Sequence, residues 1–272
     1  MNGLGDEHGL DLVLEAVRDA SGLEFRNYAR TTLRRRIDEV VRSERVTGRE
    51  ALSKLALADP AVAARIVAAL CVSVTSMFRD PEFYQAYRAI AVPRLAASGA
   101  IRAWHAGCAT GEEVWSHAVL LEEEGLGSTA RFYGTDLSSA ALLRAQRGLL
   151  PLDRMREYTL AYYRAGGRAD FSAYYLTDGA SAVVRSFLRR RAAFGRHDLV
   201  SAARLGQFEV VFCRNVLIYF DANLQQRVHA LIADCLRPGG VLALGHGEAL
   251  PDALRGAYTP LDERAKLYVR TV

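Results

Sequence analysis

IRAWHAGCATGEEV, residues 101–114, joins an apolar run to a glycine-containing turn and an acidic helix start. A short continuous apolar run of this kind is typical of a strand that is buried on both faces. Gly107 and Gly111 allow a tight turn, and the amides of a helix N-terminus can be approached there by a ligand. The stretch therefore predicts a strand, a turn and a helix, with a ligand site at the turn.

The same alternation continues along the chain. Further strands are predicted at ARFYGTD (130–136), FEVVFCR (208–214) and VLALGH (241–246), with a short one around AAFGRH (192–197). Helices are predicted at GEEVWSHAVLLEEEG, SSAALLRAQRG and ANLQQRVHALIADCLRPGG. Strands that alternate with helices predict an α/β fold, a doubly wound Rossmann-like sheet covered on both faces.

The N-terminal part has a different pattern. Residues 9–70 read as helices, one of which places Leu33, Ile37, Val40 and Val41 on one face. After them, Asp80-Pro81 is predicted to start a helix and Pro93 to break it. We therefore expect a small all-helical domain with its linker at residues 1–88 and the α/β domain at residues 89–272.

One segment of the α/β domain does not fit the alternation. FSAYYL, AVVRSFL and RRRAAFG, within residues 168–196, look like small antiparallel strands. They predict a small β insertion at about residues 168–196.

Composition excludes several classes of protein. Half of the residues are apolar and about a quarter are charged, which is usual for a globular protein. The N-terminal residues lack the basic and apolar pattern of a secretory signal, and no segment is long and apolar enough to span a bilayer. We therefore expect a cytoplasmic protein. The four cysteines lie far apart in sequence and indicate neither a disulfide framework nor a zinc site.

The turn at residues 107–113 favours a particular kind of ligand. It lacks the Gly-x-Gly-x-x-Gly fingerprint of nicotinamide dinucleotide enzymes, and Glu112 and Glu113 would repel a pyrophosphate. Asp136 ends the next predicted strand, where doubly wound folds place a carboxylate for ribose hydroxyls. A nucleoside with a positive charge and no phosphate suits these residues, and S-adenosylmethionine is a common cofactor of that description.

Five segments also resemble one family in the same order. They are SVTSMFRDPEFY, WHAGCATGEEVWS, YGTDLSSAALLRAQRG, FEVVFCRNVLIYF and LRPGGVLALGHGE. Together they are similar to the chemotaxis receptor methyltransferases of the CheR type, over nearly the whole chain. The resemblance implies transfer of a methyl group from S-adenosylmethionine to glutamate side chains of a receptor, with S-adenosylhomocysteine as the product and no metal.

The resemblance also implies site residues. Ser73, Thr75 and Arg79 would reach the cofactor from the segment between the domains, and Gly107 lies in the cofactor loop. Glu113 and Asp136 would hold the amino-acid end and the ribose. Further expected contacts are Asp198 and Leu199 at the adenine and Arg214 and Asn215 closing the pocket. Arg79 and Tyr219 would lie nearest to the methyl group and are the expected catalytic residues.

The chain departs from the family pattern at four places: Val114-Trp115 replaces Pro-Tyr, Met77-Phe78 replaces two phenylalanines, Asp198-Leu199 replaces Asn-Leu, and Gly247 replaces a serine. Loss of a proline at a first helical turn removes only preorganisation. The departures bear on the identity of the substrate more than on cofactor binding.

The expected reaction needs no general base. A glutamate carboxylate with a pKa of about 4.3 is already an anion at neutral pH. The main tasks of the enzyme are therefore to align the carboxylate with the methyl group and to remove water from it. Arg79 could orient a carboxylate through two parallel donors, although a salt bridge with Asp80 or Glu82 is the plainer interpretation of that arginine. His105, His117, His229 and His246 show no metal-ligand spacing and are expected to be core residues.

Partners are suggested by charge. Arg26–Arg49 contains eight arginines and three acidic residues, a basic helix that could dock on the acidic methylation region of a receptor or could be a solvated face. The β insertion could add a strand from a tethered receptor peptide or could simply cover the cofactor pocket. Alternatives to receptor methylation are methylation of another protein, a small molecule or RNA, and a cofactor-binding module without turnover. No aromatic-rich single-strand motif supports RNA.

Overall fold

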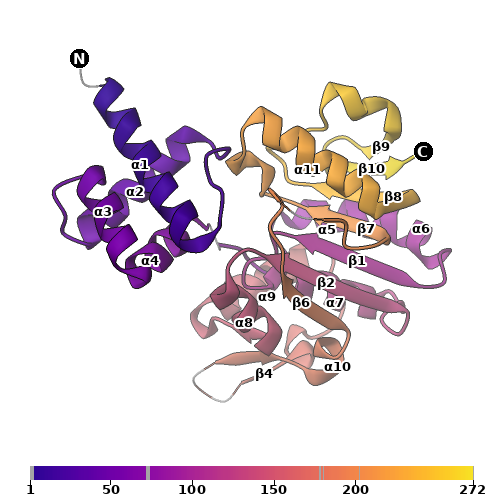
Figure 1. Ribbon diagram of the computed structural model, residues 1–272. Coiled ribbons are helices and arrows are strands. Elements are labelled where there is room, and N and C mark those ends of the chain that lie inside the picture. Colours follow the sequence, from indigo (N-terminus) through magenta and orange to yellow (C-terminus); the bar gives the residue numbers. More distant parts are fainter. Residues whose placement is uncertain (1–2, 72–73, 178, 180, 202, 272) are drawn as a thin grey trace. The chain divides into compact units, whose positions relative to one another are not determined.

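Five parallel strands form the centre of the α/β fold. The computed structural model describes residues 3–71, 74–177, 179, 181–201 and 203–271. A seven-stranded sheet has the order β6-β2-β1-β7-β8-β10-β9, in which β10 runs antiparallel to both β8 and β9 (Figure 1). Its strands are β1 (Ile101–Ala106), β2 (Ala130–Asp136), β6 (Ala192–Arg196), β7 (Phe208–Cys213), β8 (Leu236–Leu244), β9 (Tyr258–Asp262) and β10 (Leu267–Arg270).

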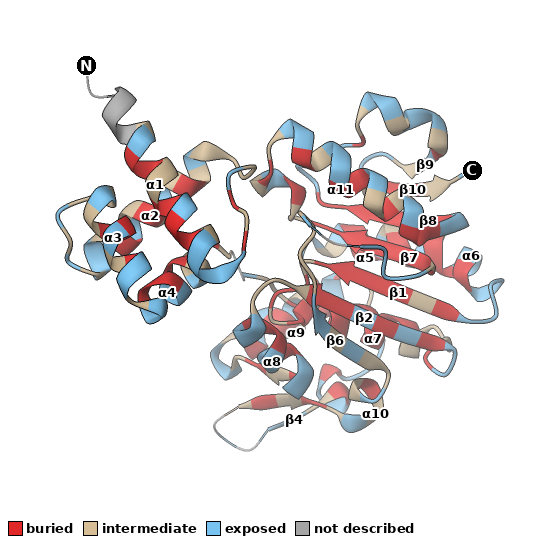
Figure 2. Ribbon diagram, viewed as in Figure 1, coloured by how far each residue is buried: buried red, intermediate tan, exposed pale blue. Residues whose placement is uncertain are grey.

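The central strands are apolar because helices cover both faces of the sheet. Every residue of β7 is buried, whereas β6 at the edge is largely exposed (Figure 2). Helix α11 lies on one face and helices α6 and α7 on the other (Figure 1). The α/β helices are α5 (Pro81–Ala86), α6 (Val92–Ala96), α7 (Glu112–Glu123), α8 (Ser139–Arg147), α9 (Met155–Arg164), α10 (Ser186–Arg189) and α11 (Ala222–Cys235). The predicted doubly wound sheet is confirmed.

The strand order fixes where a ligand can bind. Strand β1 pairs with β2 on one side and with β7 on the other, so the winding of the chain reverses at β1. In open α/β sheets the crevice for a ligand lies beyond the carboxyl ends of the strands at such a reversal. The residues that follow β1, β2 and β7 are therefore the place to look for a site.

The structure divides into two compact units. The helical unit comprises Met1–Val72 with Ile218–Arg227, and the α/β unit comprises Ser73–Leu217 with Val228–Val272. The domain boundary expected between residues 88 and 89 concerns independent folding, and it stays a prediction. The helices of the helical unit before residue 72 are α1 (Gly3–Ser21), α2 (Arg30–Ser43), α3 (Arg49–Ala58) and α4 (Pro60–Leu70).

The helical unit follows local sequence signals. Leu33, Ile37 and Val40 are buried as expected from α2, while Val41 is only half-buried. Helix α4 begins with Pro60, and the Asp59 carboxylate accepts a hydrogen bond from the Ala61 amide at 2.8 Å. The segment 218–227 joins this unit, since the Ala29 amide donates to the Tyr219 carbonyl at 2.8 Å.

The expected break at Pro93 is wrong. A π turn at Tyr87–Ala91 connects α5 to α6, and Pro93 lies inside α6. In this wider turn the Val92 amide donates to the Tyr87 carbonyl, five residues back. A proline conflicts with the carbonyl four residues before it in a regular α-helix, and the wide turn displaces that carbonyl.

The β insertion differs in detail from its prediction. Its three strands, in the order β3-β5-β4, are β3 (Leu149–Leu150), β4 (Tyr175–Thr177) and β5 (Ala182–Val184), all antiparallel. The stretch RRRAAFG does not belong to it, because Ala192–Arg196 forms β6 and pairs in parallel with β2. Ser186–Arg189, expected as strand, is helix α10. Apolar runs this short do not show whether a segment forms a helix or a strand, or which sheet a strand joins.

Candidate functional site

The loop after β1 is held in an unusual backbone conformation. Gly107, Ala109 and Gly111 all have positive φ, at 69°, 49° and 92°. A Cβ on Gly107 would lie 2.6 Å from a methyl carbon of Val216, and one on Gly111 would lie 2.8 Å from the Cβ of Ala145. Glycine is therefore required at both positions, by backbone conformation and by close packing.

Asp136 links the ends of β1 and β2. One carboxylate oxygen accepts from the Ala109 amide at 2.8 Å, and the other accepts from the Ser138 amide at 2.9 Å. Burial raises the pKa of this carboxyl. Each oxygen of a carboxylate can accept a second hydrogen bond, so Asp136 holds the loop and still has acceptor capacity for a ligand hydroxyl.

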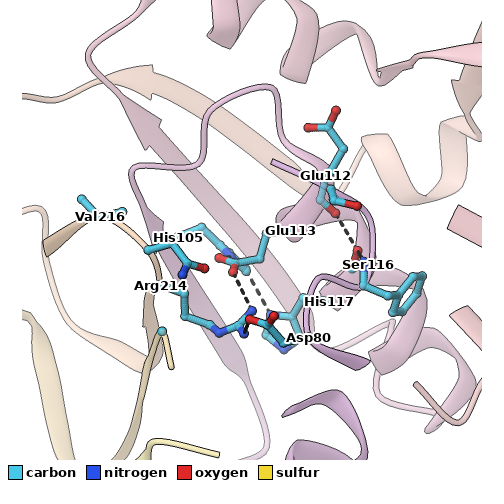
Figure 3. A network of polar contacts seen from close by, with 12 residues as sticks. Asp80, His105, Glu112, Glu113, Ser116, His117, Arg214 and Val216 are labelled. Atoms are coloured by element: carbon cyan, nitrogen blue, oxygen red, sulfur yellow. Dashed lines mark hydrogen bonds and ion pairs between the residues drawn. The ribbon is translucent and has the colours of Figure 1, made fainter. Parts of the chain in front are cut away.

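The two glutamates at the start of α7 differ in their surroundings. Glu112 is buried, and the Thr110 hydroxyl donates to it at 2.6 Å, while burial raises its pKa. Glu113 faces His105, whose Nδ1 lies 3.1 Å from Oε1, and Arg214, whose Nη1 lies 3.2 Å from Oε2 (Figure 3). Burial opposes ionisation of Glu113, but these hydrogen bonds and the charge of Arg214 outweigh it and lower its pKa.

Arg214 connects this glutamate to the segment before α5. Its Nη2 donates to the Asp80 carboxylate at 2.9 Å, and its guanidinium stacks 3.8 Å from the centre of the Phe83 ring. The side chain is only 1 % exposed. Asp80, which sequence reasoning did not include in the site, thus belongs to the charged network. It pairs with Arg214 rather than with Arg79, the pairing that was the plainer alternative for Arg79.

Arg79 itself points to a hollow. It is exposed, and within the part of the chain that the structure describes its guanidinium has no ion pair. Thr75 and Arg79 both line a hollow of about 500 Å³ whose wall includes Arg154, Glu157 and Leu160. Ser73, the third residue expected from this segment, lies outside the described residues.

The loop after β7 is fixed by a glutamate that sequence reasoning missed. The carboxylate of buried Glu248 accepts four backbone amides at 2.6–3.0 Å; they belong to Gly245, Asn215, Val216 and Leu217. Asn215 has φ 60°, a left-handed conformation that this binding supports. The only sequence signal for this role was the position of Glu248 in the GHGE segment directly after a predicted strand.

The remaining expected residues lie less centrally. Asp198 and Leu199 follow β6 and are half-buried, and the Asp198 carboxylate accepts from the Val200 amide and the Ser201 hydroxyl, both at 2.9 Å. Tyr219 is half-buried in a 3₁₀ turn (Leu217–Tyr219) and belongs to the helical unit. The structure therefore brings together the loop at Gly107 with Glu113, Asp136, Arg214 and Asn215.

Three of the histidines are buried, as expected for core residues, while His246 is exposed. His105 and His117 are also hydrogen-bonded to each other at 3.1 Å, a contact that sequence reasoning did not foresee.

Among the described residues, no group of three histidine, cysteine or acidic side chains is placed to hold a metal ion. The described helices also include none that is long and apolar enough to cross a membrane.

The arrangement suits a cationic nucleoside. Two carboxylates lie beyond the carboxyl ends of the central strands, Glu113 at the start of α7 after β1 and Asp136 at the end of β2. Neither the loop nor α7 contains a lysine or arginine that could bind a phosphate there. The ammonium group of an amino acid could bind Glu113, and ribose hydroxyls could donate to Asp136.

Comparison with known proteins gives a consistent result. Residues 73–265 match the family model described as CheR methyltransferase, SAM binding domain. The chain is 37% identical over 258 residues to the putative methyltransferase Cher3 of Pseudomonas putida, which covers 94% of each chain. It is 34% identical over 197 residues to chemotaxis protein methyltransferase 1 of Pseudomonas aeruginosa, covering 68% of this chain and 69% of that one.

A chemotaxis protein methyltransferase of Listeria innocua is 29% identical over 232 residues, covering 84% of this chain and 85% of that protein. Among solved structures, the N-methyltransferase NodS of Bradyrhizobium japonicum, in complex with S-adenosylhomocysteine, gives a TM-score of 0.33 at 16% identity and covers 62% of each chain.

Proposed function

Because this chain belongs to the CheR methyltransferase family, we propose that it transfers the methyl group of S-adenosylmethionine to glutamate side chains of a chemoreceptor-like protein. The chain is an S-adenosylmethionine-dependent methyltransferase. The structural observation that carries the proposal is the pair of carboxylates, Glu113 and Asp136, at the point where the winding of the sheet reverses. The proposed substrate is the cytoplasmic region of a receptor, so the reaction takes place in the cytoplasm.

The cofactor is proposed to lie across the ends of β1, β2 and β6. Glu113 accepts the ammonium group, Asp136 accepts the ribose hydroxyls, and Asp198 with Leu199 flanks the adenine. The loop at Gly107 lets the backbone approach the ligand, and Arg214 with Asn215 closes the pocket. Ser73 and Thr75 complete the contacts from the segment before α5. No metal takes part in this proposal.

When bound, S-adenosylmethionine supplies an electrophilic methyl group on a sulfonium. The substrate glutamate is already an anion, so a carboxylate oxygen forms the new bond to carbon while the carbon–sulfur electron pair stays on sulfur. The products are a methyl ester and S-adenosylhomocysteine, and no proton moves. The protein therefore has to align the carboxylate and exclude water, which can remove on the order of 7–11 kcal/mol of barrier.

Arg79 and Tyr219 are the proposed catalytic residues. The guanidinium of Arg79, which has no ion pair among the described residues, lines the hollow at Thr75 and can offer two parallel donors to a carboxylate. Tyr219 can donate one further hydrogen bond. Both would position the substrate rather than transfer a proton.

The receptor is proposed to dock on α2. Several arginines of the basic stretch already have partners in the helical unit, including Arg34 with Glu7 and Arg49 with Asp38. Arg35 and Arg42 are exposed, seven residues apart on one face of α2, and have no ion pair within the described residues. These two arginines are therefore the proposed contacts to an acidic receptor helix, and the edge strand β4 is the proposed place for a peptide tether.

The proposal is tested by titration calorimetry with S-adenosylmethionine and S-adenosylhomocysteine, followed by transfer of labelled methyl to receptor cytoplasmic fragments. Binding with base-labile label on glutamates, lost in Arg79→Ala, is the expected result. Binding without label on any receptor would move the search to RNA, small molecules or a role without turnover. The absence of cofactor binding would overturn the proposal.

Docking is tested separately with the double variant Arg35→Glu and Arg42→Glu. The KM for the receptor fragment should rise while cofactor affinity stays unchanged, because the two arginines belong to the helical unit. Lys54→Glu, which reverses an exposed cation on α3, is the matched control. An unchanged KM at low salt would contradict docking on α2.

A further inference from the structure

A chain of three hydrogen bonds runs from the protein interior to Glu113. The Tyr87 hydroxyl lies 2.9 Å from Nε2 of His117, Nδ1 of His117 lies 3.1 Å from Nε2 of His105, and Nδ1 of His105 lies 3.1 Å from the Glu113 carboxylate. Tyr87, His105 and His117 are all 0% exposed. Figure 3 shows the two histidines beside Glu113 and Arg214.

The proton in each of these three hydrogen bonds can be assigned by starting from Glu113 and from Tyr87. The ionised carboxylate of Glu113 can only accept, so Nδ1 of His105 carries a proton. In a neutral His105 ring, Nε2 then accepts from Nδ1 of His117, and Nε2 of His117 accepts from the Tyr87 hydroxyl. Burial holds the pKa of His117 well below its usual range, and burial also raises the pKa of Tyr87. Each of the three bonds therefore holds one proton.

A second proton on His105 would disrupt this assignment. Nε2 of His105 would become a donor, His117 would have to reverse its own proton, and Tyr87 would have to accept from it. The Tyr87 hydroxyl proton would then need another acceptor, and within the described residues the hydroxyl has only His117 as a partner. A buried donor without an acceptor is unfavourable, so the three hydrogen bonds favour the arrangement in which Nδ1 of a neutral His105 donates to Glu113.

Glu113 is surrounded by groups from several elements. Arg214 follows β7, Asp80 and Tyr84 come from the start of α5, and the histidines come from β1 and α7. Arg214 is shared between Glu113 and Asp80, so it does not neutralise Glu113 alone. A cationic His105 would add a second positive charge beside the carboxylate and compete with a ligand ammonium group.

We propose that Tyr87, His117 and His105 form a positioning chain that fixes the Glu113 carboxylate and keeps its charge available to the amino group of the cofactor. This inference rests on the proposed role of Glu113 in cofactor binding. The three residues touch neither the cofactor nor the substrate in this proposal. They act through Glu113, by orienting its carboxylate.

Two substitutions at His105 separate positioning from packing. The amide nitrogen of asparagine can take the place of Nδ1 and still donate to Glu113, whereas that of glutamine takes the place of Nε2 and reaches His117 instead. His105→Asn should keep the affinity for S-adenosylhomocysteine within about threefold, and His105→Gln should weaken it about tenfold, as for loss of a hydrogen bond to a charged group. Equal affinities for two folded variants would overturn the proposal.

Tyr87→Phe tests the far end of the chain. It leaves Nε2 of His117 without its donor, so the His117 ring is no longer held in the tautomer whose Nδ1 donates to His105. At pH 8 the affinity for S-adenosylhomocysteine should then fall about fivefold relative to the unmodified protein. Tyr158→Phe removes another buried hydroxyl, one without a hydrogen-bond partner in the described residues, and should match the unmodified protein. An unchanged affinity in folded Tyr87→Phe would contradict the proposal.

A third readout does not depend on the cofactor. Long-range proton–nitrogen NMR of the histidine-labelled protein without ligand at pH 8 should show His105 and His117 both protonated at Nδ1. A neutral His105 ring with its proton at Nε2 would overturn the inference. If the unmodified protein binds no cofactor, the proposed function fails; if it binds and the His105 variants bind equally, only the positioning chain fails.

Discussion

Glu112 and Glu113 are adjacent in sequence, but their carboxylates meet different partners. Glu112 is enclosed and bonded to the Thr110 hydroxyl, and burial raises its pKa. Glu113 lies between His105 and Arg214, which together outweigh burial and lower its pKa. Sequence analysis expected cofactor binding from Glu113, and the structure gives a physical reason to distinguish it from its neighbour.

Glu113→Gln and Glu112→Gln should therefore differ in effect. Loss of the charge at position 113 removes a charge-assisted hydrogen bond, and the affinity for S-adenosylmethionine should fall about tenfold to a hundredfold. Glutamine at position 112 can still accept from Thr110 and should change the affinity less than about threefold. Titration calorimetry on both variants at pH 7.5 compares them, and equal losses would show that Glu113 has no special role.

Gly107→Ala should destabilise the α/β unit by about 2–3 kcal/mol, because a side chain there has an unfavourable backbone conformation and overlaps Val216. Gly99 has a similar φ of 73° but nothing within 4 Å of a Cβ, so Gly99→Ala should lose only about 1 kcal/mol. Urea denaturation gives both values. Adding Val216→Ala to Gly107→Ala should restore part of the lost free energy of unfolding. If none is restored, contact between the new Cβ and Val216 is not the cause of the loss.

At the scale of elements, the site depends on how the loops after the strands are held. Asp136 connects the ends of β1 and β2, and Glu248 connects the end of β8 to the loop after β7. Both are single carboxylates that accept backbone amides from residues distant in sequence. Both residues lie at or just after a predicted strand, but no local pattern pairs residue 248 with residues 215–217, so the partners of Glu248 could not be foreseen.

Glu248→Gln should open this loop. Whichever way the amide turns, its NH₂ group meets two backbone N–H donors that Glu248 now satisfies. The expected loss of stability is about 3 kcal/mol, from unsatisfied buried donors. Hydrogen exchange at residues 215–217 should increase at the same time. Glu263→Gln, at an exposed glutamate, is the control. Unchanged hydrogen exchange at residues 215–217 in Glu248→Gln would show that Glu248 does not hold this loop.

Sequence patterns predicted elements better than their connections. The ends of β1 and β2 agree with the predicted stretches, because buried parallel strands have continuous apolar runs and sharp glycine or aspartate boundaries. The π turn before Pro93 and the assignment of Ala192–Arg196 to the main sheet depend on tertiary contacts. For the site, residue types at strand ends could be foreseen, whereas the partners of Arg214 and His105 required the three-dimensional arrangement.

At the scale of the whole molecule, stability should depend on pH through His229. Burial lowers the pKa of this side chain to about 4, from an ordinary value of 6.5. Above pH 6.5 neither the folded nor the unfolded state binds the proton. Below it the unfolded state takes up a proton that the folded state excludes, so the free energy of unfolding decreases down to about pH 4.

The expected loss from this residue is about 3 kcal/mol across that window. His229→Leu should remove most of it, which urea denaturation at pH 7 and pH 4.5 can measure. His8→Leu, at an exposed histidine of the helical unit, should leave the pH dependence as it was. If His229→Leu and the unmodified protein lose stability equally on acidification, another group is responsible.

The division of the chain into two units limits how the gene can be truncated or recombined. Ile218–Arg227 belongs to the helical unit, so the polypeptide passes between the units at residues 72–73, 217–218 and 227–228. A gene fragment that ends at residue 72 would therefore encode an incomplete helical unit, and the remainder would keep a ten-residue stretch of it. A single crossover therefore cannot exchange the whole helical unit for that of a relative; two separate stretches of the gene would have to change together.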